Sequence, residues 1–332
     1  MFAGIGESGQ EKLGRSKVLL VGCGALGSVQ AEILVRAGIG KLTIADRDFI
    51  EESNLQRQTL FAEQDCREGL PKAIAAARRL RVINSSVQIS EHVLDVNSRT
   101  LEPLLPEQDL IMDGTDNFET RFLLNDAAWK WGIPWIYGAC VGSYGICLPI
   151  MPPHPPCLRC VMEEMPPPGS SPTCDTIGII APIVHQIAAL QTAAALKVLS
   201  GNAAQMHPRL VTADLWDWRL STIDFQNWQS DRSCPCCGEG RYEFLEGKHE
   251  GRTQSLCGRN AVQIWRVDPK PVNFETIAER LATLGSVTYN EFMLKAVVDA
   301  YEIALFRDGR GIVRGTQDLD EARSVYAKYI GN

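Results

Sequence analysis

The stretch KVLLVGCGALG, residues 17–27, decides the fold of this chain. Its first five residues are apolar apart from Lys17, which predicts a strand buried on both faces. Residues 28–37 then show helical spacing, and a second buried strand is expected at 41–45, followed at once by Asp46. Strand, glycine loop, helix and strand within about thirty residues predict a βαβ unit with parallel strands and a right-handed crossover.

The same alternation continues along the chain and predicts a doubly wound, Rossmann-like α/β sheet. The expected elements are helices at 72–82 and 119–131 and strands at 87–90, 110–112, 134–139 and 209–213. A proline-rich segment at about 151–176 interrupts the pattern, and we expect a mobile crossing loop without helix or central strand. Residues 1–238 are therefore expected to form one domain, and 239–332 a small α+β domain to which no role is assigned.

Charge and hydropathy exclude several classes of protein. Lys and Arg total 33 against 40 Asp and Glu, giving a formal net charge of −7, whereas nucleic-acid binders normally carry a basic surplus. Residues 177–199 are apolar enough to suggest a membrane helix, but His185, Gln186, Gln191 and Lys197 favour a helix in a protein core. With no secretory signal at the start of the sequence, we expect a cytoplasmic protein without membrane or nucleic-acid partners.

The glycine loop predicts a phosphate site. Gly22 permits the tight turn, Gly24 lets the backbone approach a phosphate, and Gly27 allows close helix packing. The helix that follows offers free N–H groups to an anion, and Asp46 is placed to accept hydrogen bonds from a ribose. These features alone also suit an NAD(P)-dependent oxidoreductase, which stays an alternative.

Further polar residues favour a triphosphate over a dinucleotide. The segment Ser53-Asn54-Leu55-Gln56-Arg57-Gln58 and Lys72 would place cations beyond the ribose site. Phosphoryl chemistry depends on neutralising spread negative charge. Asp116, followed by Asn117 just past the end of a strand, is placed to hold Mg²⁺, which prefers oxygen ligands.

Two pairs of cysteines predict a metal site. Two residues separate Cys157 from Cys160, and two separate Cys234 from Cys237, which is the spacing of a tetrahedral structural zinc site. Cys236 is a spare thiol that could replace either member of the second pair. Cys174 precedes the apolar helix and is either a nucleophile with a lowered pKa or a passive half-buried cysteine.

Taken together, these residues resemble the ThiF/MoeB/HesA family, the bacterial relatives of ubiquitin-activating enzymes. The resemblance runs from about Gly4 to Gly238 and rests on a combination of motifs. They are GCGALG at 22–27, SNLQRQ at 53–58, Pro71-Lys72, TDN at 115–117 with Arg121, both cysteine pairs, and Thr173-Cys174 before GIIAP at 178–182.

By this resemblance, the chain is an adenylyltransferase. Such enzymes activate the C-terminal glycine of a small ubiquitin-like sulfur-carrier protein ending in Gly-Gly, with release of pyrophosphate from MgATP. The resemblance implies that the glycine loop and Asp46 bind ATP, that Asn54, Arg57 and Lys72 face the phosphates, and that Asp116 holds Mg²⁺. It also implies zinc on Cys157, Cys160, Cys234 and Cys237, and a carrier-linked role for Cys174.

The resemblance further implies a homodimer, a sulfur-donor protein, and a place in thiamine, molybdopterin or tRNA sulfur pathways. Two departures stand out. Ala25 replaces a glycine found in many members, and the sequence begins inside a segment that members usually precede with an Arg-Gln pair. The second departure keeps a non-catalytic ATP-binding member as an alternative, and a tRNA-modifying dehydratase is a further alternative within the family.

Overall fold

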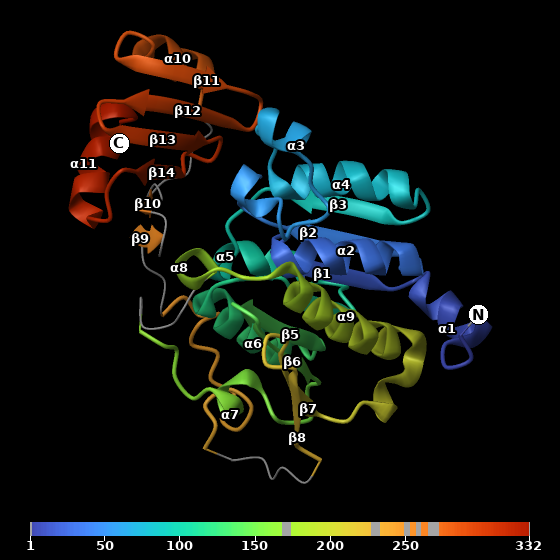
Figure 1. Cartoon of the computed structure of the whole chain (residues 1–332). Helices are drawn as coiled ribbons and strands as arrows, with labels where there is room; N and C mark the ends of the chain where they lie inside the picture. The colour runs from blue at the N-terminus through green and yellow to red at the C-terminus, as the bar shows by residue number, and fades with distance from the viewer. Residues whose placement is uncertain are drawn as a thin grey trace. The chain divides into compact units, whose positions relative to one another are not determined.

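The computed structural model describes residues 2–167, 174–226, 233–248, 253–256, 260–264 and 272–331. It divides the chain into two compact units. The first comprises Met1–Pro167 and Ile177–His249, and the second comprises Pro168–Thr176 and Glu250–Asn332. Each unit has its own sheet (Figure 1).

The first unit is built on an eight-stranded sheet in the order β3-β2-β1-β4-β5-β6-β7-β8. The five strands from β3 to β5 are parallel, and β6, β7 and β8 continue the sheet in antiparallel pairing. The predicted α/β fold class is therefore confirmed. The strands are β1 (Lys17–Val21), β2 (Lys41–Ala45), β3 (Gln88–His92), β4 (Leu110–Asp113), β5 (Trp135–Val141), β6 (Tyr144–Ile150), β7 (Arg209–Asp214) and β8 (Arg219–Asp224).

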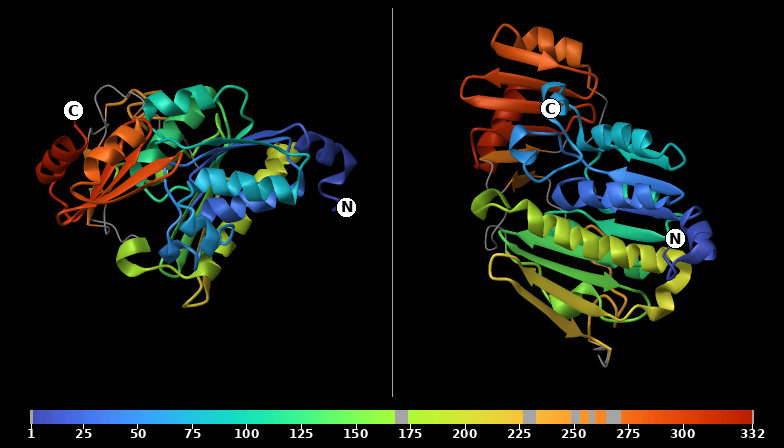
Figure 2. Two further views of the ribbon diagram at one scale, coloured as in Figure 1. Left: turned by 90° about the horizontal axis from the view of Figure 1, so that it is seen from above. Right: turned by 45° about the vertical axis from the view of Figure 1, so that its right-hand side comes forward.

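Helices cover both faces of this sheet. Helices α2 (Ala25–Ala37), α4 (Lys72–Ile83) and α9 (Ala181–Lys197) lie side by side on one face, and α6 (Phe118–Trp131) lies on the other (Figure 2). The core beneath α6 includes Leu19, Val21 and Ile111 of the parallel strands. The shorter helices are α1 (Gly6–Leu13), η1 (Glu52–Asn54), α3 (Glu63–Arg67), α5 (Ser98–Leu101), η2 (Glu102–Leu104), α7 (Leu158–Val161), α8 (Cys174–Ile177), η3 (Val198–Asn202) and η4 (Ala203–Gln205).

The expectation that the proline-rich segment holds no helix is wrong at two places among its described residues, because α8 begins at Cys174 and α7 forms further upstream. Helix α7 forms a single turn at Leu158–Val161, between the prolines, and carries the first cysteine pair. Its backbone closes locally because Met162 N–H donates to the Leu158 carbonyl at 2.8 Å. Residues 168–173 of the same predicted loop lie outside the described residues.

The apolar helix belongs to the core of the first unit. Among the described residues, the stretch Ala181–Gln205 is long and apolar enough to span a membrane by length and composition, but 56% of its most apolar window is buried. Helix α9 packs against α2, β5 and β6. Gln191, in the middle of α9, is fully buried and donates to the carbonyls of Asp113 and Ile136. These two hydrogen bonds explain why a polar residue stands inside an apolar run.

The second unit is a six-stranded antiparallel sheet in the order β11-β12-β13-β14-β10-β9. Its core is formed by one face of the sheet and by two amphipathic helices, with Leu294, Ile303 and Val313 packed against Phe274 and Tyr326. The elements are β9 (Thr253–Leu256), β10 (Ala261–Ile264), α10 (Phe274–Leu281), β11 (Gly285–Tyr289), β12 (Met293–Val298), β13 (Tyr301–Phe306), β14 (Gly311–Arg314) and α11 (Leu319–Tyr329).

Candidate adenylation site and cysteine cluster

The glycine loop connects β1 to α2 with no room for larger side chains at two of its three glycines. Gly22 has φ +82°, a left-handed conformation that favours glycine. A Cβ atom on Gly27 would lie 2.0 Å from the Gly22 carbonyl oxygen, so helix and loop touch backbone to backbone. A Cβ on Gly24 would meet only Gln58 Nε2, at 3.7 Å, which leaves that side of the loop open to a ligand. Ala25 begins helix α2 directly after it.

Asp46 fixes the loop to the end of β2. One carboxylate oxygen accepts a hydrogen bond from Cys23 N–H at 2.5 Å, and the other accepts from Asp48 N–H at 2.6 Å. Burial raises the pKa of the Asp46 carboxyl, and the nearby Lys72 ammonium acts in the opposite direction. Burial also raises the pKa of the Cys23 thiol, so this loop cysteine is a poor nucleophile.

Lys72 is a cation whose charge acts on both Cys23 of this loop and Asp46. It is the first residue of α4, its side chain is only 5% exposed, and its Nζ lies 3.1 Å from an Asp48 carboxylate oxygen. A buried ammonium is unfavourable without a counter-charge, and Asp48 supplies one. Lys72 is thus held at the carboxyl ends of the parallel strands, beside Asp46.

The segment at 53–58 folds into a short turn that faces the same loop. Asn54 is buried and closes the turn by accepting from Glu51 N–H, and the buried Arg57 donates to the Ser53 carbonyl at 3.0 Å. The neighbouring Gln58 faces Gly24, and its buried Oε1 has no hydrogen-bond partner among the described residues. An unpaired buried acceptor beside an open glycine fits a site that is completed by a ligand.

The turn after β4 presents Asp116 to solvent. Its base is rigid, because Asp113 Oδ1 accepts from both the N–H and the hydroxyl of Thr115, at 2.9 and 2.7 Å. Asn117 caps α6 by accepting from Thr120 N–H at 2.8 Å, and Asp116 itself is exposed. An exposed carboxylate at the end of a parallel strand fits a Mg²⁺ ion that also binds phosphate oxygens.

Two arginines lie close to Asp116. Arg47 donates to Asp95 at 2.6 Å, and although burial lowers its pKa, the charges of Asp95, Asp48 and Asp116 raise it overall. Burial also lowers the pKa of Arg121. The charges of the neighbouring Tyr137, Asp113 and Asp116 raise it by more, so the pKa of Arg121 is raised overall. Both guanidinium groups therefore stay charged beside the candidate metal ligand.

The four predicted cysteine ligands form one cluster. The sulfur atoms of Cys157, Cys160, Cys234 and Cys237 lie within 4.8 Å of one another, with separations of 3.7, 3.6 and 3.3 Å for the pairs 157–160, 157–234 and 160–237. A tetrahedral zinc with Zn–S bonds of about 2.3 Å would place its sulfurs roughly 3.8 Å apart. The arrangement fits a closed structural zinc site.

Helix α6 holds both cysteine segments in place. The fully buried Asn125 accepts from Leu158 N–H at 2.8 Å and donates to Cys236 Sγ at 3.1 Å. The Cys236 thiol, which is not one of the four clustered sulfurs, is thus hydrogen-bonded to α6. The next residue, Asp126, accepts from Phe244 N–H at 2.9 Å, and burial raises its pKa to about 6. These contacts tie residues distant in sequence to one helix.

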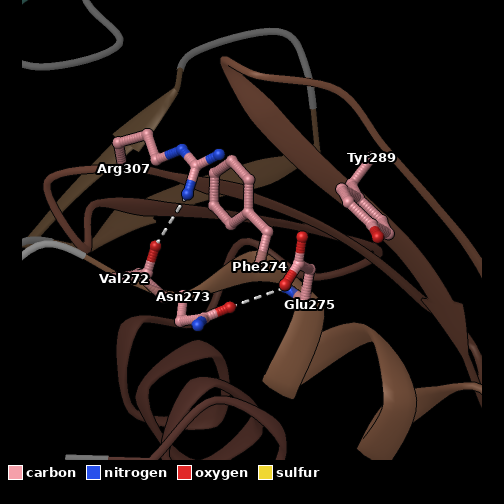
Figure 3. Close-up of a pocket in the computed structure, with 6 residues that line it drawn as sticks. All are labelled: Val272, Asn273, Phe274, Glu275, Tyr289 and Arg307. Atoms are coloured by element: carbon pink, nitrogen blue, oxygen red, sulfur yellow. Dashed lines mark hydrogen bonds between the residues drawn. The ribbon is translucent and has the colours of Figure 1, made fainter.

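Cys174 is the first residue of the one-turn helix α8 and is half-buried. Its expected nucleophilic role stays a prediction. The second unit also has an open pocket of about 350 Å³, in which Arg307 lies 4.1 Å from the Phe274 ring centroid and donates to the Val272 carbonyl (Figure 3). Asn273, Glu275 and Tyr289 complete its lining, and none of these residues was predicted as a site residue.

Sequence reasoning assigned no role to several residues that shape the site. Arg47 and Asp48 follow Asp46 directly, and their partners lie 48 and 24 residues further on, at Asp95 and Lys72. Arg121 was recognised as part of a motif only. The signal that could have found Asp48 is its position on the same strand-end turn as Asp46.

The chain is similar to known proteins over most of its length. Residues 1–236 match the ThiF family. The chain is 44% identical over 332 residues to the Sulfur carrier protein ThiS adenylyltransferase of Bacillus subtilis (strain 168), covering 100% of this chain and 97% of that relative. It is 34% identical over 242 residues to the SAMP-activating enzyme E1 of Haloferax volcanii, covering 73% of this chain and 87% of that protein.

Similarity extends to solved structures. The crystal structure of E. coli MccB with MccA-N7isoASN has a TM-score of 0.60 at 25% identity and covers 70% of this chain and 69% of that chain. From its sequence match and its fold, this chain belongs to the ThiF family.

Proposed function

We propose that this chain adenylates the C-terminal carboxylate of a small ubiquitin-like sulfur-carrier protein of the ThiS type. A carboxylate oxygen attacks the α-phosphorus of ATP, the bond from that phosphorus to the bridging oxygen breaks, and pyrophosphate leaves. The observation that carries the proposal is the full-length similarity to a ThiS adenylyltransferase, joined to an open glycine loop with Lys72 beside it.

The residues of this chain supply binding and electrostatics for that reaction. The open side of Gly24 and the N-terminus of α2 receive a phosphate, and Asp46 accepts from the ribose hydroxyls. Lys72 and Arg57 offset the repulsion between an anionic tail and a polyanion. Asp116, with Asn117 at the cap of α6, would hold Mg²⁺, which would neutralise charge on the phosphates.

Zinc on Cys157, Cys160, Cys234 and Cys237 would have a structural role. With four sulfur ligands no coordination position is left for substrate, so the ion would fasten the proline-rich segment to the end of the unit. Binding of such an ion contributes directly to folding free energy. The reaction itself needs no step at this cluster.

Further features follow from membership of the family and stay proposals. We expect a homodimer, a sulfur-donor protein as a later partner, and a role for Cys174 in a carrier-linked intermediate. We also expect the enzyme to act in the cytoplasm, most directly in thiamine biosynthesis. Light scattering of the purified chain tests the homodimer, and a mass shift of the carrier that is lost in Cys174→Ser tests the thiol.

Exchange of labelled pyrophosphate into ATP tests the activity. We expect exchange only when the carrier is present, and a loss of about 100-fold in Asp116→Ala, in line with removing one electrostatic group from such a site. Asp320→Ala is the matched control, because that carboxylate is 91% exposed in the second unit. Full exchange in Asp116→Ala would reject the metal assignment. ATP binding without exchange would favour a non-catalytic member, and tight NADH binding without ATP binding would favour the oxidoreductase alternative.

A further inference from the structure

Arg121 is a buried cation that contacts the short turn after β4. It lies on the first turns of α6 with only 6% of its surface exposed. Its Nη2 donates to the Thr115 carbonyl at 2.7 Å. Its Nε lies 3.8 Å from Asp113 Oδ2 and has no hydrogen-bond partner in the part of the chain that the structure describes. The guanidinium lies 5.4 and 5.7 Å from the ring centroids of Phe118 and Tyr137.

Stability alone is a weak reason for this arginine. Taking a guanidinium out of water costs several kcal/mol of desolvation free energy. An ion pair at 3.8 Å with one unpaired N–H offsets only a small part of that cost. An apolar side chain of similar length would fill the space between the two rings without this desolvation. The arrangement therefore points to a purpose other than packing.

The turn that Arg121 holds is the one that carries Asp116. Asp113 Oδ1 binds the N–H and hydroxyl of Thr115 from one side, and Arg121 binds the Thr115 carbonyl from the other. Gly114 closes the third side, since a Cβ there would lie 2.2 Å from the Gly22 carbonyl oxygen. Asp116 is the first residue beyond these restraints, and it is exposed.

We infer that Arg121 is a positioning residue for adenylation, which fixes the turn at 113–116 so that the Asp116 carboxylate is held in place beside the glycine loop for Mg²⁺. The role rests on the proposed function, because Asp116 matters only if it binds the metal of MgATP. A fixed carboxylate loses less conformational freedom when it binds the ion. Loss of Arg121 would therefore weaken metal binding more than ATP binding.

Arg121→Met tests this role, with Arg310→Met as the matched control. Arg310 is also buried, at 2% exposure, lies 3.8 Å from the Phe306 ring centroid and 3.9 Å from an aspartate oxygen, but belongs to the second unit. Mn²⁺ is titrated into each protein with α,β-methylene ATP and followed by electron paramagnetic resonance. We expect the apparent Kd for Mn²⁺ to rise about tenfold in Arg121→Met, as for other outer-shell partners of metal ligands, and to stay unchanged in Arg310→Met.

Hydrogen–deuterium exchange of the metal-free protein provides a second readout. The Gly114 and Thr115 amides, bonded to the Val21 carbonyl and to Asp113, should exchange faster in Arg121→Met, while amides of the second unit should not. If Arg121→Met does not fold, Arg121→Lys decides, with a Mn²⁺ affinity expected below that of the native protein. Unchanged Mn²⁺ affinity and turn exchange in a folded variant overturn the inference. Absence of pyrophosphate exchange in the native protein, in contrast, counts against the proposed function.

Discussion

Replacing Gly27 by alanine should separate the architecture of the glycine loop from its chemistry. The added Cβ would lie 2.0 Å from the Gly22 carbonyl oxygen, whereas ordinary contacts begin at 3.4 Å, so α2 and the loop must move apart by more than an ångström. The atoms nearest to this Cβ belong to the backbone of Gly22, so no side chain can rotate away. Gly114 lies close to the same carbonyl and hinders its displacement.

The size of the effect follows from two opposed terms. Overpacking of this kind costs typically about 1–3 kcal/mol, with the upper end expected for a backbone clash. Alanine in a helix gains roughly 0.5–1 kcal/mol over glycine. We therefore expect a net loss of about 2 kcal/mol, which in a unit of this size lowers Tm by roughly 4–8 °C.

Gly24→Ala is the matched control for the same loop. Its Cβ would meet only Gln58 Nε2 at 3.7 Å and no backbone atom, so we expect the fold to tolerate it. We expect Tm within about 1 °C of the native value but at least a roughly tenfold weaker ATP affinity, because the methyl group fills the open phosphate side. Differential scanning calorimetry and isothermal titration with ATP measure both. A Gly27→Ala protein of native Tm, or a Gly24→Ala protein of native ATP affinity, would refute the reasoning.

Three other variants test the remaining parts of the site. Lys72→Gln should lower the exchange rate about 100-fold, because it removes the cation beside Asp46; exchange at the native rate would remove Lys72 from the site. Cys160→Ser should lose zinc in elemental analysis while Cys66→Ser, a half-buried thiol outside the cluster, retains it; equal zinc in both would contradict the four-sulfur assignment. Asn125→Ala should lose about 1–3 kcal/mol by leaving the Leu158 N–H unpaired, read as a lower Tm at unchanged ATP affinity, and a native Tm would show that this hydrogen bond contributes little.

The sequence was sufficient for the parts of the fold that have a strong local signal. Strands β1 and β2 are continuous apolar runs that a parallel sheet buries on both faces, and the glycine loop between them has a fixed spacing. The paired cysteines also give a strong local signal, because two residues between the cysteines let both thiols of a pair bind one metal ion. Strand β8 was missed because all six of its residues are exposed, so no periodic burial marks it.

Long-range pairing explains what the sequence left out of the site. Two ion pairs, Asp48 with Lys72 and Arg47 with Asp95, form only when the strands come together. No regular spacing in the sequence predicts these pairs. The same holds for Asn125, which links two cysteine segments that are 77 residues apart. Arg121 belongs to a motif that can be recognised in the sequence. Its burial near two aromatic rings and its hydrogen bond to the turn at 113–116 are visible only in the structure.

The most direct test of adenylation is the mass of the carrier itself. A ThiS-type carrier ending in Gly-Gly is incubated with this chain, ATP and Mg²⁺ and analysed by intact-protein mass spectrometry. We expect the carrier to gain one AMP group at its C-terminus, and a carrier whose terminal carboxylate is blocked as an amide to gain none. Equal AMP transfer to the blocked carrier, or no adduct on the free one while ATP is bound, would contradict the account.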